Sequence, residues 1–194
     1  MRIVAGEFRG RELVTPGGDT TRPTAARARE ALFAILSDVS DAHVLDLYAG
    51  SGALGFESLS RGAARAVLVE SSKAAQRAIR TNAENLRVAD RVTLLPLRAE
   101  ASLKALERLG GFSLVFADPP WADVQSALAL LEKLAASTLL LPAARLVLEH
   151  AARNPPTPAS GSRLIATDTR RWGDTAVTLF ELIEAPSPAT ESSP

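Results

Sequence analysis

The stretch DLYAGSGALGFE, residues 46–57, places an acid at the end of an apolar run, just before three closely spaced glycines. Gly50, Gly52 and Gly55 follow the spacing G-x-G-x-x-G, which lets a strand-to-helix turn bring its backbone close to a ligand. In dinucleotide-binding proteins such a turn holds a pyrophosphate at the helix N-terminus. The carboxylate of Asp46 would repel a pyrophosphate, and it suits a ligand that carries a positive group.

Acids also end the next two expected strands. Glu70 closes RAVLVE, where a carboxylate can accept hydrogen bonds from ribose hydroxyls, and Glu100 follows RVTLLPL. Three successive strand ends therefore present a carboxylate. S-adenosylmethionine, with its ammonium, sulfonium, ribose and adenine amino groups, fits such a site better than NAD, although the ribose contact is common to both ligands.

The stretch DPPW, residues 118–121, follows the fourth expected strand. Proline has a fixed φ and no N–H, so this loop is stiff and presents carbonyl oxygens without competing donors. The Asp118 carboxylate and the Pro119 carbonyl can accept hydrogen bonds from an exocyclic amine and orient it for attack on a methyl sulfonium. Trp121 offers a flat face to a base that is single-stranded or flipped out. Asp-Pro is common in turns, so this signal becomes strong only together with the acidic glycine turn.

The elements that must position these residues alternate between strand and helix from about residue 43 to 149. This pattern predicts an α/β, Rossmann-like sheet, mostly parallel, with helices on both faces. Residues 162–183 predict a C-terminal antiparallel hairpin that turns at Gly173-Asp174. Residues 2–14 predict an N-terminal β-hairpin, followed by a helix over about 25–37. In such sheets ligands bind beyond the carboxyl ends of the strands, where both motifs lie.

Composition limits the class of protein. With 194 residues, 46% hydrophobic and 23% charged, the chain fits one compact domain. We expect an N-terminal basic extension over 1–40, a core over 41–184 and a disordered tail over 185–194. The sequence has no cysteine, which excludes disulfides and thiolate metal sites. No signal peptide or membrane span stands out, so we expect a cytoplasmic protein without a metal or a membrane partner.

The net charge is zero, so attraction to a nucleic acid would have to come from a local patch. The first 29 residues hold the marked excess of arginine, the residue best suited to bidentate phosphate contacts. The candidates for RNA contact there are Arg9, Arg11, Arg22, Arg27 and Arg29, with Arg9 and Arg11 expected to flank the pocket mouth. The only histidines, His43 and His150, are expected to be structural.

These motifs together resemble the RsmD family, bacterial methyltransferases that act on the N2 amine of a guanine in 16S ribosomal RNA. The resemblance covers about residues 1–184. It is carried by RIVAGEFRGREL, RPTAARAREALFAIL, LDLYAGSGALGFESLSRGA, VLVESS, DPPW and WGDTAVTLFEL. Two features depart from the pattern: Trp121 stands where Tyr or Phe is more frequent, and the stretch before Glu100 is less standard.

The resemblance implies a class I methyltransferase fold that uses S-adenosylmethionine, with 16S ribosomal RNA or the small ribosomal subunit as partner. It implies that Asp118, Pro119, Pro120 and Trp121 hold the target amine. It also implies a cofactor site made of Asp46, Tyr48, Ala49, Gly50, Ser51, Gly52, Gly55, Glu70, Ser71, Ala99 and Glu100. The residues alone indicate only the exocyclic amine of a flat ring. A DNA amino-methyltransferase acting on adenine N6 or cytosine N4 is therefore an alternative, and an NAD-dependent oxidoreductase is a remote one.

Overall fold

The computed structural model describes residues 1–17 and 23–183, with the side chains of 23–26 left aside. The strands are β1 (His43–Leu47), β2 (Arg65–Val69), β3 (Val92–Leu95), β4 (Phe112–Ala117), β5 (Leu140–Ala151), β6 (Leu164–Trp172) and β7 (Thr175–Leu182). The helices are α1 (Pro23–Leu36), α2 (Ala53–Ser60), α3 (Lys73–Leu86), α4 (Leu103–Leu106) and α5 (Val124–Ala136). Three short 3₁₀ turns are η1 (Ala89–Arg91), η2 (Ala99–Ala101) and η3 (Trp121–Asp123).

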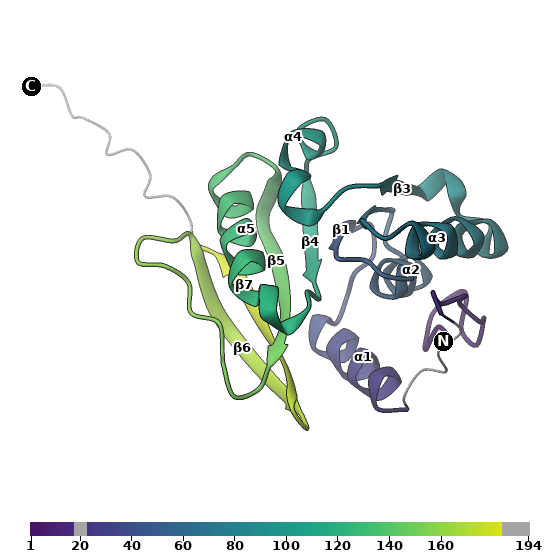
Figure 1. Cartoon of the computed structure of the whole chain (residues 1–194), viewed down its shortest axis with the longest axis horizontal. Coiled ribbons are helices and arrows are strands. Elements are labelled where there is room, and N and C mark those ends of the chain that lie inside the picture. The colour runs from purple at the N-terminus through teal and green to yellow at the C-terminus, as the bar shows by residue number, and fades with distance from the viewer. Residues whose placement is uncertain (18–22, 184–194) are drawn as a thin grey trace, which may run out of the picture.

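The strands form one sheet in the order β3-β2-β1-β4-β5-β7-β6 (Figure 1). Strands β1 to β5 are parallel, and β7 runs antiparallel between β5 and β6. The chain first builds outward from β1 to β3 and then crosses to place β4 on the other side of β1. This reversal opens a crevice at the carboxyl ends of β1 and β4, where ligands of doubly wound sheets bind. The predicted sheet and its closing hairpin are confirmed.

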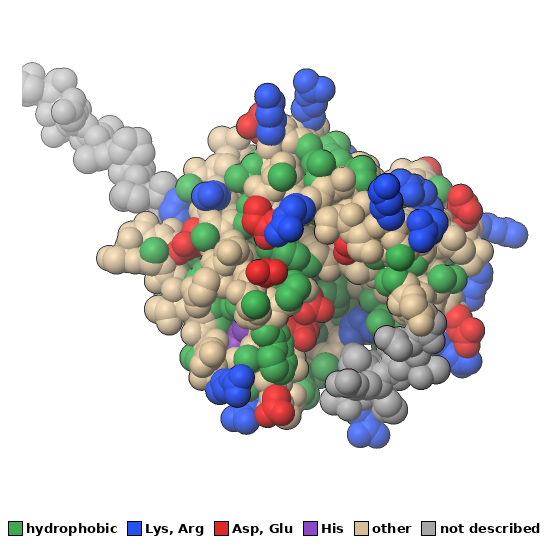
Figure 2. All heavy atoms as spheres, viewed as in Figure 1, with side chains coloured by type: hydrophobic (Ala, Val, Ile, Leu, Met, Phe, Trp, Pro, Cys, Tyr) green, Lys and Arg blue, Asp and Glu red, His purple; other side chains and the backbone are tan. Residues whose placement is uncertain are grey.

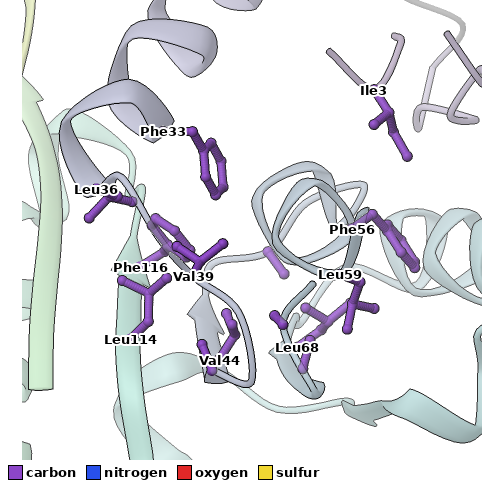
Figure 3. Close-up of a cluster of buried hydrophobic side chains, with 14 of the residues drawn as sticks. Ile3, Phe33, Leu36, Val39, Val44, Phe56, Leu59, Leu68, Leu114 and Phe116 are labelled. Carbon is purple, nitrogen blue, oxygen red and sulfur yellow. The ribbon is translucent and has the colours of Figure 1, made fainter. Parts of the chain in front are cut away.

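Two apolar layers cover the sheet, because alternate residues of each strand point to opposite faces. Leu114 and Phe116 of β4 pack with α1, α2 and α3, while Val115 and Ala117 pack with α4 and α5. Figure 3 shows the first layer, in which Phe33 of α1 meets Phe116 with ring centroids 5.8 Å apart. The arrangement leaves the carboxyl ends of the strands free of covering helices.

The expected N-terminal hairpin is reduced to a single antiparallel bridge between Arg2 and Glu12. The N–H groups of Ile3, Gly10 and Leu13 still donate across the segment to the carbonyls of Arg11, Ile3 and Met1, and other backbone groups bond to α2. The buried carboxylate of Glu57 accepts the N–H groups of Val4 and Ala5, at 2.8 and 3.0 Å. The segment therefore lies along α2 as an irregular strap.

The boundary expected near residue 40 stays a prediction, although Ile3 and Phe33 belong to the same apolar cluster as the strands. The expected tail over 185–194 and Arg22 lie outside the described residues. In the described part of the chain, no helix is both long enough and apolar enough to cross a bilayer.

Candidate functional site

In the glycine turn after β1, two glycines are required by close packing, and the third borders open space. A Cβ on Gly52, whose φ is +80°, would lie 2.6 Å from the Phe56 ring, and a Cβ on Gly55 would lie 2.4 Å from Leu68. A Cβ on Gly50 would meet nothing within 4 Å. Gly50 is therefore the glycine of this motif that leaves room for a ligand.

Glu70 ties this turn to the end of β2. One of its carboxylate oxygens accepts the N–H of Gly50 at 2.8 Å, and the other accepts the N–H of Ser72 at 2.6 Å. Each oxygen keeps a second lone pair, so the carboxylate can still accept from hydroxyl groups. The Asn82 amide fixes the other side of the turn by donating to the Ser51 carbonyl at 3.0 Å.

A cavity of about 610 Å³ opens beyond β1, β2 and β4, and we call it the donor cavity. Its volume lies within the range of small-molecule sites. Five residues expected at the cofactor line it, namely Tyr48, Glu70, Ser71, Ala99 and Glu100. The other lining residues are Val69, Leu97, Arg98, Asp118, Pro119, Pro120, Trp121 and Asp123. Loops distant in the sequence thus meet at one concave surface.

Tyr48 and Glu100 form a bonded pair in the wall of this cavity. The Tyr48 hydroxyl donates to the Glu100 carboxylate at 2.8 Å. This bond holds the pKa of Glu100 below its usual range. Burial, with the carboxylate next to it, raises the pKa of Tyr48. The pair therefore keeps a neutral phenol and a charged carboxylate at neutral pH.

Asp46 lies beneath the turn and does not line the donor cavity. Its carboxylate accepts the N–H of Gly55 in the first turn of α2 at 3.1 Å, a position where the helix dipole favours negative charge. Burial raises the pKa of Asp46 to about 8, against the effect of the Gly55 bond, and the charges of Asp118 and Glu70 add to the rise. Direct contact between Asp46 and a cofactor, as the sequence predicted, is therefore not supported by this geometry.

A second cavity of about 300 Å³ lies on the face of the sheet that α1 and α2 cover, and we call it the acceptor cavity. It is lined by Met1, Ala28, Arg29, Leu32, Ala53, Leu54, Phe116, Ala117, Asp118, Val147, Glu149, Trp172, Thr175 and Val177. Among these described residues, only Asp118 also lines the donor cavity. Molecules bound in the two cavities would therefore meet at this carboxylate.

A second acid, Glu149, faces the acceptor cavity, and sequence reasoning missed it. Ala117 and Leu148 are register partners, so Asp118 and Glu149 occupy the next positions of neighbouring strands. Burial raises the pKa of both carboxyls, and the charge of Asp118 raises that of Glu149 further. By surface area, however, Asp118 is exposed and Glu149 is half-buried. The available signal was an acid inside the apolar run LVLEH.

The two tryptophans occupy different cavities. Trp121, which is 50% exposed, lines the donor cavity with Pro119 and Pro120. The half-buried Trp172 of β6 lines the acceptor cavity. Trp121 lies away from the acceptor cavity because the chain continues from Pro120 into α5, and α5 packs on the face of the sheet opposite to α1. The sequence had placed Trp121, rather than Trp172, against the target base.

Of the arginines expected at RNA, Arg9 and Arg11 line neither cavity, and Arg29 lines the acceptor cavity but is buried. Arg29 is 6% exposed, lies 3.5 Å from the Glu57 carboxylate and donates to the Arg2 carbonyl. Arg11 donates to the Asn85 carbonyl at the C-terminal end of α3. Arg9 lies in the turn whose neighbouring N–H groups bond to Ser60, the last residue of α2.

Helices α2 and α3 return from the carboxyl edge to the amino edge of the sheet. The expectation that Arg9 and Arg11 flank the pocket is therefore wrong. Arg27 is exposed on α1 beside Ala28, which lines the acceptor cavity, whereas Arg29 is buried. Arg27 and Arg29 therefore point to different faces of their helix.

The histidines take no part in either cavity. His150 is buried and bonds Thr178 at 2.9 Å, and His43 stacks near Phe112. Within residues 1–17 and 23–183, no three His, Asp or Glu side chains are grouped as a metal site would require.

Comparison with known proteins identifies the family of this chain. Residues 1–181 match the model of the family described as "Conserved hypothetical protein 95". The chain belongs to this family. It is 32% identical over 183 residues to the Bacillus subtilis protein named "Putative rRNA methyltransferase YlbH", across 93% of this chain and 98% of the relative.

A second relative is the Escherichia coli protein named "Ribosomal RNA small subunit methyltransferase D". It is 38% identical over 122 residues, which are 62% of this chain and 60% of the relative. The solved structure described as "Putative methyltransferase yhhF from Escherichia coli" has a TM-score of 0.79 at 33% identity, covering 94% of this chain and 97% of that one. The resemblance to the RsmD family and the Rossmann-like methyltransferase fold are thus confirmed.

Proposed function

We propose that this protein transfers a methyl group from S-adenosylmethionine to the exocyclic N2 amine of a guanine in 16S ribosomal RNA, free or within the small subunit. The observation that carries the proposal is the position of Asp118 between two cavities. One cavity is large, polar and built from strand-end loops, and the other is smaller and largely apolar. This arrangement suits a donor and an acceptor that meet at a single group.

The residues of the donor cavity fit the cofactor. The free lone pairs of Glu70 suit ribose hydroxyls, and Gly50, whose N–H bonds to Glu70, leaves open space beside the cavity for the methionine portion. Ala99, Glu100 and Leu97 form a wall suited to the adenine ring. The anionic groups Glu70, Glu100 and Asp118 favour a cationic ligand. The bound cofactor would supply an electrophilic methyl group on its sulfonium.

The acceptor amine needs help because its lone pair is delocalised into the base. The Asp118 carboxylate can accept one of its hydrogens, and a second acceptor, either the Pro119 carbonyl or a side chain of the acceptor cavity, can take the other. These bonds aim the nitrogen at the donor cavity. As the new nitrogen–carbon bond forms, the carbon–sulfur bond breaks and its electrons stay on sulfur. The nitrogen becomes positive and then releases a proton, for which the adjacent Asp118 carboxylate is placed as acceptor.

The RNA-facing surface remains a proposal and now centres on the acceptor cavity. Basic side chains lie around the face shown in Figure 2 without covering it, in line with the net charge of zero. Arg27 stands beside the cavity on α1. Arg170 pairs across the hairpin with Val177, a residue of the cavity wall, so it shares the face of the sheet on which the cavity lies. We propose these two arginines as phosphate contacts.

The test is transfer of tritiated methyl groups to small subunits and to 16S RNA from a strain that lacks this protein. We expect label in 16S RNA, released by nuclease digestion as N2-methylguanosine, and none in subunits from the parent strain. Duplex and single-stranded DNA serve as the comparison for the DNA amino-methyltransferase alternative. Label in N6-methyladenine or N4-methylcytosine of DNA, with none in RNA, would overturn the proposal.

A further inference from the structure

We infer that Glu149 reads the identity of the target base, by accepting hydrogen bonds from two neighbouring N–H groups on one edge of a guanine. The inference rests on the proposed function and adds the residue that sets base specificity. It predicts that an acid on β5, outside every recognised motif, decides which amine is methylated.

The position of Glu149 follows from strand alternation. Val147 faces the α1 and α2 layer and Leu148 the opposite one, so Glu149 again points to the side of the acceptor cavity. Its register partner Val177 lines the same cavity. On the other side, Asp118 follows directly after β4. The two carboxylates thus stand side by side at the junction of the cavities.

This pair of acids has no evident structural role. Across the described residues, neither carboxylate has a hydrogen-bond donor or a cationic partner, unlike the buried Glu57, which accepts from two backbone N–H groups and pairs with Arg61. Glu149 is half-buried and Asp118 is exposed at the cavity wall, and two neighbouring carboxylates repel each other. A ligand that brings several N–H donors would relieve both the missing bonds and the repulsion.

Guanine has the matching edge. It presents N1–H and the two hydrogens of the N2 amine, three donors in one plane. A carboxylate accepts two parallel N–H bonds well, so Glu149 can take N1–H and one amine hydrogen while Asp118 takes the other. Adenine and cytosine present a ring nitrogen acceptor beside their amine, and its lone pair would face the Glu149 carboxylate. The geometry therefore selects against the amines that DNA amino-methyltransferases modify.

The experiment compares two bases that both carry a 2-amine. 2-Aminopurine lacks N1–H and has an acceptor at N1. Once the methylated guanine is mapped, 16S RNA is assembled by ligation with either guanine or 2-aminopurine at that position. The wild-type protein should prefer guanine by about 100-fold in kcat/KM, the upper range for one bidentate contact.

The Glu149→Gln variant replaces one acceptor by an amide NH₂, which can donate to N1 of 2-aminopurine. We expect guanine methylation to fall by roughly 100-fold and the preference between the two bases to narrow or reverse. Glu149→Asp, shorter by one methylene, should lower the rate on guanine but keep the preference. Glu181→Gln, a matched change at an exposed acid of β7, should alter neither.

The outcomes separate the two proposals. Wild-type protein that transfers no methyl group to guanine in RNA would contradict the proposed function. Wild-type activity on guanine, with an unchanged preference in Glu149→Gln, would overturn the inference alone. Calorimetric titration with S-adenosylhomocysteine and the melting temperature check that each variant is folded and binds cofactor. Should Glu149→Gln not fold, a Glu149→Asp variant that loses the preference for guanine would contradict the inference.

Discussion

The two cavities on either side of Asp118 are built in different ways. The donor cavity is lined by residues that directly follow strands, within short motifs such as VLVESS and DPPW. The acceptor cavity collects residues from the N-terminal strap, α1, α2 and four strands. This difference indicates which part of the fold determines cofactor binding and which part determines the choice of acceptor. Cofactor binding follows from the order of parallel strands, whereas the choice of acceptor depends on how distant segments pack.

The largest expected effect is on the rate of methyl transfer, and it comes from replacing Asp118, the residue that both cavities share. Asp118→Ala should lower the rate of methyl transfer on the order of 100-fold, the scale seen when one transition-state contact is lost, and change cofactor affinity little. Glu70→Ala, as the matched change in the donor cavity, should weaken binding of S-adenosylmethionine and S-adenosylhomocysteine equally, by about 1–3 kcal/mol. Single-turnover kinetics and calorimetry measure the two effects. Equal loss of cofactor affinity in both variants would mean that the cavities act as one site.

The second prediction concerns Asp46 beneath the donor cavity. Its pKa of about 8 in the folded chain lies above the ordinary value of 3.8, so the unfolded chain releases this proton first as the pH rises. The contribution of Asp46 to stability therefore falls between about pH 4 and pH 8, with a limiting slope of about 1.4 kcal/mol per pH unit.

Asp46→Asn keeps an oxygen that can accept from Gly55 and does not titrate. We expect the free energy of unfolding of this variant, measured in urea, to be higher than that of the wild type, and the difference to grow from about pH 5 to about pH 8. Parallel profiles for the two proteins would show that Asp46 is ionised without penalty in the fold.

The third prediction compares the two tryptophans. Trp172→Ala should weaken binding of RNA by about 1–3 kcal/mol, the range for a lost base–aromatic stack, because the indole lines the acceptor cavity. Trp121→Ala should have a smaller effect on RNA, because its indole stands in the donor cavity. Filter binding at fixed salt measures both. A larger loss in Trp121→Ala would place the base at the rim, as the sequence alone predicted.

The smallest expected effect is on the salt dependence of RNA binding, and it is tested by comparing two pairs of arginines. Replacing Arg27 and Arg170 by Ala should lower the slope of log affinity against log salt by about 0.7–0.9 per lost phosphate contact. Replacing Arg9 and Arg11, at the amino edge of the sheet, should leave the slope unchanged. Filter binding across a salt series gives both slopes. The opposite result would place the RNA along the N-terminal strap.

Much of the donor side could be predicted because its signals are local. An apolar strand, a turn with glycines at fixed spacing and an acid at the strand end lie within a dozen residues. The need for glycine at positions 52 and 55 also comes from nearby residues, because Phe56 and the neighbouring strand leave no space for a side chain. The role of Asp46 at the cofactor stays a prediction, because the same pattern serves a ligand or a helix N-terminus, and in the structure Asp46 is buried and accepts from Gly55.

The sequence by itself determined the alternation of strands and helices, the position of both motifs at strand ends and the family. Periodicity and turn residues act over short distances, and parallel order then brings the motifs to one edge. Only the tertiary structure decided that the buried Glu57 lies next to Arg29 and accepts hydrogen bonds from the N-terminal backbone. It also decided that Arg9 and Arg11 lie at the amino edge of the sheet and that Glu149 lies beside Asp118. These outcomes depend on register between strands far apart in the chain and on which buried charges find partners, and neither is encoded within any short stretch.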